Sequence, residues 1–225
     1  MCGRYFLEAS ADKLMAVFGE MPMPALAPRY NIAPTQPVPI VRQADNARRE
    51  MVLVRWGLVP GWSKGPDSRY SMINARVETV ATKPAYRSAF RYRRCLIPAD
   101  GFYEWKASAD GKQPYVLRAR DRQPLALAGL WEHWQDDQGN ELETCVILVR
   151  SADQQTSTVH DRMPVIVTPA SFDAWLDLRI QKPQPVETLL AAQQPPELSI
   201  YPVSRDVNSP RNDRAALIDP LPETD

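Results

Sequence analysis

The second residue of the chain, Cys2, carries the most distinctive chemistry in the sequence. Removal of Met1 would leave an α-amine and a thiol on one residue, with ordinary pKa values of about 8 and about 8.5. Such a pair condenses with an aldehyde to an imine, which closes to a five-membered thiazolidine. Alternatively, the thiol is a nucleophile and the amine its base, as in N-terminal nucleophile hydrolases. Arg4 is the candidate cation for activating the thiol, because a positive neighbour lowers a thiol pKa.

Two further residues are candidates for proton transfer. His160 stands between a polar stretch and an apolar strand, a position that suits catalysis, and Asp161 or Arg162 would set its tautomer or charge. Glu104 lies between two large aromatic residues. An apolar setting raises a carboxyl pKa and suits a general acid or base, whereas a solvent-facing strand carboxylate is the alternative.

The remaining polar candidates are simpler. Asn74 and Arg76 are two residues apart, so in a strand both side chains would face one side. An amide there would hold a carbonyl or an amine, and a guanidinium would bind phosphate. His133 is expected to be structural, and Cys95 and Cys145, each in an apolar stretch, are expected in the core. No cofactor is predicted, and no cluster of ligands predicts a metal.

The elements that must position these side chains are mostly strands. A short helix is predicted over residues 10–19, with Ser10 or Asp12 as N-cap and Gly19 as C-cap. Predicted strands cover residues 38–42, 51–59, 94–98, 101–106, 115–118, 125–134, 142–150 and 164–168. Predicted helices cover 84–90, 169–176 and 186–192, and hairpin turns are predicted at 110–111 and 138–140. Without βαβ alternation, this order predicts an α+β fold, mostly antiparallel sheet curled into a barrel-like core with flanking helices.

Charge is unevenly distributed along the 225 residues. The 27 basic and 27 acidic side chains cancel, which argues against a protein that coats duplex DNA by bulk positive charge. Residues 29–106, however, hold 14 basic and 6 acidic side chains interleaved with aromatic ones. Cations that follow phosphates, together with rings that stack on bases, are typical of a single-strand groove. The alternative is an ordinary sheet with a solvated arginine face.

The chain as a whole is typical of one soluble domain. Hydrophobic residues make up 44% and charged residues 24%, which excludes a disordered tail protein. We expect a single domain over residues 1–225, with a polar tail from about residue 206 wrapping its surface. Three cysteines cannot form a disulfide framework, and neither a signal peptide nor a membrane span is apparent. A cytoplasmic protein is therefore expected.

Taken together, seven segments resemble the SOS response-associated peptidase (SRAP) family of abasic-site-processing proteins. They occur across nearly the whole chain in the order of the family, and as a set they are highly specific. The segments are 1–5 (MCGRY), 29–34 (RYNIAP), 56–62 (WGLVPGW), 73–79 (INARVET), 97–105 (IPADGFYEW), 160–164 (HDRMP) and 202–204 (PVS).

The resemblance implies a domain that captures abasic sites in single-stranded DNA, including single-strand/duplex junctions, as a covalent thiazolidine on Cys2. It implies that Asn74 positions the amine and the sugar, that Glu104 shuttles protons, and that His160 assists imine chemistry and its reversal. DNA would be held by five further residues: Arg4, Pro39, Trp62, Arg76 and Arg162. Ser63 follows Trp62 where some members carry a second aromatic residue.

The resemblance also implies peptidase and lyase-like activities, a monomer, and association with the nucleoid through DNA. The peptidase would remove a short N-terminal extension, but Cys2 here follows Met1 directly, so ordinary methionine removal would suffice. Two other functions are left open. One is a glutamine amidotransferase-type hydrolase with Cys2 as nucleophile, although the Asn-Gly oxyanion motif of that family is missing. The other is a non-catalytic single-strand binding module, which would leave Cys2, Glu104 and His160 without a role.

Overall fold

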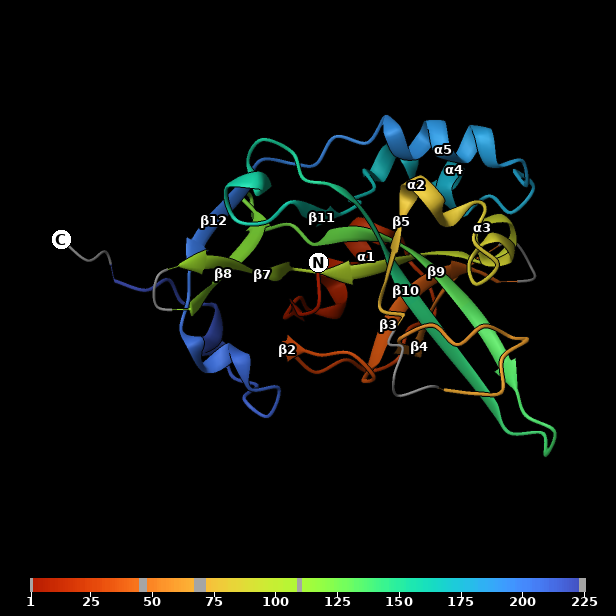
Figure 1. The fold of residues 1–225 in the computed structure, drawn as a ribbon, viewed down its shortest axis with the longest axis horizontal. Helices are drawn as coiled ribbons and strands as arrows, with labels where there is room; N and C mark the ends of the chain where they lie inside the picture. Colours follow the sequence, from red (N-terminus) through yellow and green to blue (C-terminus); the bar gives the residue numbers. More distant parts are fainter. Residues whose placement is uncertain (1, 45–47, 67–71, 109–110, 223–225) are drawn as a thin grey trace.

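The computed structural model describes residues 2–44, 48–66, 72–108 and 111–222. Two sheets form its framework (Figure 1). The strands are β1 (Tyr5–Leu7), β2 (Arg29–Ile32), β3 (Pro37–Gln43), β4 (Arg49–Trp56), β5 (Asn74–Arg76), β6 (Arg94–Ala99), β7 (Gly101–Ser108), β8 (Gly111–Ala119), β9 (Leu125–Gln135), β10 (Glu141–Ser151), β11 (Arg162–Pro164) and β12 (Leu198–Pro202). The helices are α1 (Ala11–Phe18), α2 (Val77–Val80), α3 (Arg87–Tyr92), α4 (Phe172–Leu176) and α5 (Pro183–Ala191), with short 3-10 helices η1 (Thr156–Thr158), η2 (Pro169–Ser171), η3 (Arg205–Asn208) and η4 (Ala215–Ile218).

Five strands close into a barrel. The pairs β4–β3, β3–β6, β6–β9 and β9–β10 are antiparallel, and a short parallel pairing of β10 with β4 completes the ring. Strands β5 and β11 add to β10 outside that ring. The core of the barrel is apolar and includes both Cys95 and Cys145, which are fully buried as predicted. The predicted α+β fold with a barrel-like core is therefore confirmed.

The second sheet has the order β12-β8-β7-β1-β2 and lies beside the barrel (Figure 1). Its pairing of β1 with β7 matters most for function, because Tyr5 lies opposite Phe102 and Phe6 opposite Gly101. This antiparallel register brings the N-terminal segment alongside the strand that carries Glu104. Gly101 must be glycine, since an added Cβ would come within 2.6 Å of the Phe6 ring.

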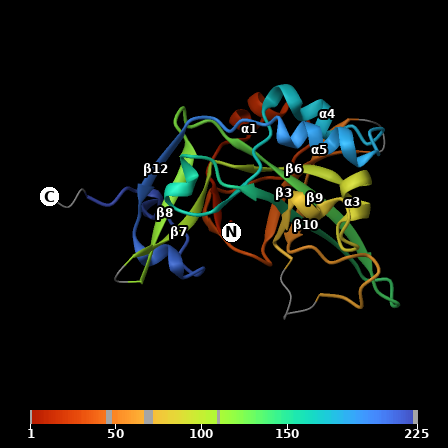
Figure 2. The same ribbon diagram turned by 45° about the horizontal axis from the view of Figure 1, so that its top comes forward.

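Local signals explain the elements that the sequence predicted best. Ser10 accepts a hydrogen bond from Lys13 N and caps α1, and Gly19 ends it with a φ of 91°, a conformation that glycine adopts readily. The Phe18 ring of α1 stacks on Phe172 of α4 at 5.4 Å, and Figure 2 shows α1, α4 and α5 grouped on one side of the molecule. The Gln138–Asn140 turn joins β9 to β10 as predicted, whereas Asp110 of the other predicted turn lies outside the described residues.

The predicted strand over residues 164–168 is wrong in extent. Only β11 forms a ladder with β10, because the segment then crosses from one partner strand to another. Val165 N donates to Leu148 O of β10, while Val167 N donates to Ala126 O of β9. The strands β1, β2 and β12 were not predicted. Strand β5 ends at Arg76, and α2 begins at the next residue.

The C-terminal segment packs closely against the second sheet. Val207 and Leu217 are buried in a small cluster with Phe6 and Tyr103. Asn31 of β2 donates to the carbonyl oxygens of Val207, Ser209 and Asn212. The segment is therefore fixed to β2 and β7 rather than lying loosely on the surface. No helix of the described residues has the length and apolar character needed to cross a membrane.

Candidate functional site

Cys2 lies buried immediately before β1. Its carbonyl oxygen accepts a hydrogen bond of 2.8 Å from the Asn74 side-chain amide, and its sulfur lies 4.0 Å from the backbone oxygen of Arg4. Asn74 opens β5, which is held in register on β10 by the pairing of Asn74 with Ile147. The barrel thus supplies an amide that fixes the backbone of the N-terminal cysteine.

Glu104 comes from the other sheet, on β7, and is 1% exposed. Burial raises the pKa of Glu104 to about 7, because a carboxylate loses its hydration there. This confirms the apolar setting expected for the carboxyl and excludes a solvent-facing one. Burial, and next the negative charge of Glu104, raise the pKa of the Cys2 thiol. The carboxyl and the thiol therefore interact, although 102 positions separate them in the chain.

His160 follows η1 and precedes β11, at the strand end predicted for it. Its Nε2 atom lies 3.9 Å from Glu104 Oε2. Its Nδ1 atom accepts a hydrogen bond of 3.0 Å from the Arg162 backbone N–H, which requires a lone pair on Nδ1. The exposed Asp161 carboxylate, 2.9 Å from Nδ1, would instead favour a proton there. These two contacts favour opposite tautomers of the neutral ring, and in both of them Nε2 is the ring nitrogen that lies toward Glu104.

Burial lowers the pKa of His160, so the neutral ring is favoured near neutral pH. Glu104, with its pKa near 7, exchanges a proton over the same range. A carboxyl and an imidazole that face one another in this way can pass protons to and from a reacting group. The site therefore combines a buried thiol, an amide donor, a carboxyl and an imidazole.

The expected activation of the thiol by Arg4 is wrong. The Arg4 guanidinium points away and donates to Asn31 Oδ1 at 2.7 Å and to Val207 O at 2.8 Å. Its positive charge therefore does not offset the effect of burial, and the Cys2 thiol pKa is raised rather than lowered. The buried Cys2 thiol therefore needs a base to become a thiolate near neutral pH.

The other expected DNA-binding residues differ in exposure. Arg76 is exposed at the end of β5, and Arg162 of β11 forms an ion pair with Glu78 of α2. Trp62 is 71% exposed. Pro39, however, is buried in the middle of β3, which leaves little surface against which a base could stack. We therefore leave Pro39 out of the DNA-binding set proposed below.

The segment that presents Trp62 is held at both ends. Val59 N donates to Thr144 Oγ1 at 3.0 Å, and Trp134 Nε1 donates to Ser63 O at 2.8 Å. Both partners lie on the β9–β10 hairpin. An exposed ring on an anchored segment is a preformed surface for stacking.

A cavity of about 380 Å³ opens beside the reacting groups. Its lining residues are Glu104, Trp105, Lys112, His160 and Asn208. Roles for Glu104 and His160 were predicted from the sequence, whereas none was predicted for Trp105, Lys112 or Asn208. Asn208 is brought there by the C-terminal segment, a placement that no local pattern reveals. Lys112 follows Gly111 in a polar stretch, and only its alignment along β8 beside β7 distinguishes it from other surface lysines.

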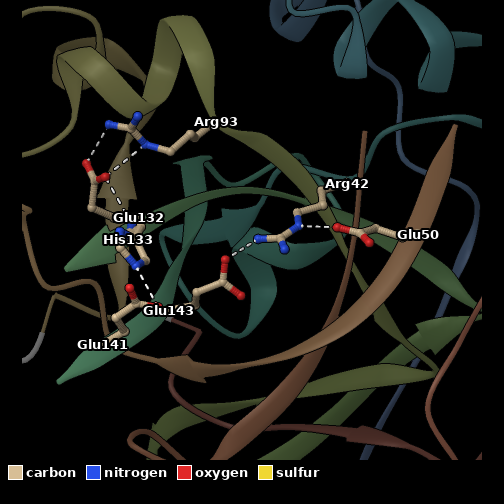
Figure 3. A network of polar contacts seen from close by, with 7 residues as sticks. All are labelled: Arg42, Glu50, Arg93, Glu132, His133, Glu141 and Glu143. Carbon is tan, nitrogen blue, oxygen red and sulfur yellow. Dashed lines mark hydrogen bonds and ion pairs between the residues drawn. The ribbon is translucent and has the colours of Figure 1, made fainter. Parts of the chain in front are cut away.

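A second polar cluster lies on the barrel, apart from this cavity, and contains His133 (Figure 3). His133 is partly exposed and lies 3.5 Å from Glu141, while Arg42 bridges Glu50 and Glu143 and lies 4.2 Å above the Trp131 ring. The cluster consists of contacts between side chains on β3, β4, β9 and β10, and a structural role for His133 stays the expectation. Across the parts of the chain that the structure describes, no three His, Cys, Asp or Glu side chains gather as a metal site.

Known proteins resemble this chain in both sequence and fold. The family model described as "SOS response associated peptidase (SRAP)" matches residues 1–210. The chain is 36% identical to the abasic site processing protein YoqW of Bacillus subtilis over 223 residues, 97% of this chain and 99% of that one. It is 32% identical to YedK of Escherichia coli over 228 residues, 98% of this chain and 100% of that one.

More distant likenesses extend the comparison. The abasic site processing protein HMCES of Gallus gallus is 30% identical over 226 residues, which cover 86% of this chain and 66% of that one. A crystal structure of a protein from Bacteroides thetaiotaomicron has a TM-score of 0.84 at 25% identity and covers 98% of this chain and 100% of its own. A phage-related protein from Bordetella bronchiseptica has a TM-score of 0.73 at 28% identity, covering 91% and 95%.

Proposed function

Because the chain belongs to the SRAP family of abasic-site-processing proteins, we propose that it captures abasic sites in single-stranded DNA as a covalent crosslink on Cys2. One observation carries this proposal. The backbone of Cys2 is held by Asn74, and its buried side chain interacts with Glu104, which itself faces His160. These are the groups that condensation of an aminothiol with an aldehyde requires.

The reaction begins at the closed sugar of the lesion. The bond between C1′ and O4′ breaks, O4′ gains a proton and the C1′ hydroxyl loses one, which leaves an aldehyde. Neutral Glu104 is suited to give the first proton, and its carboxylate to accept the second, because its pKa is about 7. We propose that the same residue serves in both transfers.

Bond formation then proceeds in two steps. The α-amine of Cys2, free after Met1 removal, adds to the aldehyde carbon, and loss of one water gives an imine. The Cys2 sulfur adds to the imine carbon, the thiol proton passes to nitrogen, and the thiazolidine closes. Glu104 and His160 supply the path for that proton, while Asn74 holds the Cys2 backbone in place. The net change is the joining of DNA and protein with loss of one water.

Ring closure also determines the fate of the DNA strand. An imine at C1′ makes the neighbouring C2′ hydrogens acidic, and their loss expels the 3′ phosphate in a lyase reaction. Sulfur addition consumes the imine and prevents this cleavage. We therefore assign the thiol a protective role and the amine the primary attack.

Three side chains would contact the DNA strand. Arg76 and Arg162 are suited to contact phosphates, and Trp62 to stack on a base. Arg4 is committed to Asn31 and Val207, so we assign it to holding the C-terminal segment, with any phosphate contact secondary. Since the lesion lacks a base, little unstacking is needed to present its sugar.

The test uses protein from which Met1 has been removed. It is incubated with a single-stranded oligonucleotide containing one abasic site and run on a denaturing gel. We expect a heat-stable shifted band whose mass is protein plus DNA minus one water, and no band with Cys2→Ala or with undamaged DNA. Cys2→Ser keeps the amine, so it should give a band only after borohydride reduction and should cleave the strand more.

Other outcomes would support the alternatives. Glutaminase activity without a crosslink would indicate an amidotransferase-type hydrolase. Salt-sensitive binding that is unchanged in Cys2→Ala, again without a crosslink, would indicate a binding module. A crosslink that survives in Cys2→Ala would contradict the assignment of the reacting residue.

A further inference from the structure

The cavity beside Glu104 and His160 has a rim that the mechanism above does not use. It is formed by Trp105 of β7, Lys112 of β8 and Asn208 of η3. β7 and β8 belong to the second sheet, and η3 belongs to the C-terminal segment bound to it. Arg76 and Arg162, in contrast, belong to strands added to the barrel sheet. His160, just before β11 of the barrel sheet, completes the lining, so the cavity lies where the two parts of the fold meet.

Lys112 supplies positive charge to this rim. It is exposed near the start of β8, opposite Ala107. Its charge reaches the reacting groups, because it contributes, after burial, to lowering the His160 pKa. No carboxylate among the described residues lies within ion-pair distance of its ammonium. The charge is therefore available to a ligand in the cavity.

Asn208 supplies a hydrogen-bond donor of fixed direction. Its Oδ1 atom accepts a 2.8 Å hydrogen bond from Trp105 Nε1, which identifies its other terminal atom as the NH₂ group. The backbone around it is fixed as well, because Val207 O accepts hydrogen bonds from both Arg4 and Asn31. The rim thus presents an ammonium and an amide donor.

We propose that Lys112 and Asn208 bind one phosphate of the DNA strand directly beside the abasic sugar. Two donors, one of them cationic, match a phosphodiester oxygen. Phosphates are bonded to the sugar on both its 5′ and 3′ sides, so a sugar that reaches Cys2 brings one to each side of the site. Arg76 and Arg162 would hold one of these, and Lys112 with Asn208 the other. The inference rests on the proposed function and adds the second side of the DNA path.

The test measures binding without crosslinking. In a Cys2→Ala background, a labelled single strand carrying one tetrahydrofuran abasic analogue is titrated, and its anisotropy is followed at several salt concentrations. We expect Lys112→Gln to raise Kd about 5- to 10-fold at low salt and to reduce the slope of log K against log salt by about 0.7, the value for one lost single-strand phosphate contact. Lys106→Gln, an equal change of charge on β7 outside the cavity, should alter Kd less than about twofold.

A neutral backbone then locates the contact. Each phosphate within two nucleotides of the lesion is replaced in turn by a methylphosphonate. At one position, the methylphosphonate should lower the affinity of the protein that retains Lys112 but should not lower the affinity of Lys112→Gln. At every other position, the methylphosphonate should lower the affinity of both proteins equally. Asn208→Asp keeps the acceptor for Trp105 but replaces the amide donor by a carboxylate oxygen. The effect of this substitution on affinity should also depend on whether the phosphate at that same position is replaced. Additive losses at every position, or equal effects of Lys112→Gln and Lys106→Gln, would overturn the proposal.

Failure of this inference is separable from failure of the proposed function. Crosslinking is measured separately, with Cys2 intact and saturating DNA, in the unsubstituted protein and in the control Lys106→Gln, both of which should form the full yield of crosslink. A crosslink formed without any specific effect of Lys112 would overturn only the phosphate site. A position-specific effect of Lys112 in a protein that never forms a crosslink would leave a phosphate site and overturn the covalent function. Unchanged thermal melting of both lysine variants serves as the folding control.

Discussion

The side-chain amide of Asn74 donates a 2.8 Å hydrogen bond to the carbonyl oxygen of Cys2. This bond joins β5, on the barrel sheet, to the chain segment that enters the second sheet at β1. It is thus a link between the two parts of the fold and, at the same time, a constraint on the residue whose amine and thiol we propose to react.

Asn74→Ala is expected to slow crosslinking about tenfold, because it removes one buried hydrogen bond of about 1–1.5 kcal/mol that orients the Cys2 backbone. DNA affinity should change much less. Single-turnover rates and binding in a Cys2→Ala background separate the two effects. Asn74→Asp is the informative partner variant: its carboxylate would repel the Cys2 carbonyl, so it should be slower still. Equal losses of rate and affinity in Asn74→Ala would contradict an orienting role.

Glu104 is expected to make both rate and stability depend on pH around 7. Its pKa is raised by burial to about 7, so between about pH 4.5 and 7 the folded protein binds more protons than the unfolded chain. The free energy of unfolding therefore falls as pH rises across this range, by at most roughly 3 kcal/mol from this group. Glu104→Gln should remove that dependence and melt at a higher temperature at pH 8, while crosslinking slowly.

Thermal melts of both proteins from pH 5 to 8, together with crosslinking rates over the same range, check this prediction. If the difference in melting temperature between the two proteins did not change with pH, burial would not be raising the pKa of Glu104. A rate unaffected by Glu104→Gln would remove it from the proton path.

Trp62→Ala is expected to weaken binding of single-stranded DNA by about 1–3 kcal/mol, the range for one base stacked on an aromatic ring. Stability should hardly change, because the ring is 71% exposed. Trp134→Phe tests the support of this ring. It keeps an aromatic ring but loses the donor to Ser63 O, so it should weaken binding by a smaller amount. Anisotropy titrations measure both, and unchanged affinity in Trp62→Ala would exclude it from the DNA path.

Arg94 is expected to stabilise the fold without any part in the reaction. Its buried guanidinium donates to the carbonyl oxygens of Phe90, Arg91, Trp175 and Asp177 at the ends of α3 and α4. Burial lowers its pKa to about 10, which still leaves it charged at neutral pH.

Arg94→Met would leave these carbonyl oxygens unpaired, and we expect a loss of about 3–5 kcal/mol in urea unfolding. The exposed Arg91 provides the control, since Arg91→Met should stay within about 0.5 kcal/mol. A loss below 1 kcal/mol in Arg94→Met would show that water reaches these carbonyls.

The sequence predicted the helices and strands that depend on interactions between residues close together in the chain. Ser10 and Gly19 end α1 because capping depends on neighbouring backbone groups. The longer strands β9 and β10 were predictable because they are long, apolar and joined by a short turn. The types of the proposed reacting residues could also be predicted, since an N-terminal cysteine carries an amine and a thiol that undergo few characteristic reactions.

Tertiary structure decided everything that depends on distant pairing. The strand β1 has three residues, too few for any period to show, yet its pairing with β7 brings Cys2 to Glu104. The Arg4 guanidinium is held by Asn31 and Val207, which lie 27 and 203 positions after Arg4 in the chain. Pro39 is buried because barrel closure covers β3. Sequence determines which groups are available, but burial and long-range hydrogen bonds are properties of the closed fold, and they set each group's protonation, direction and access.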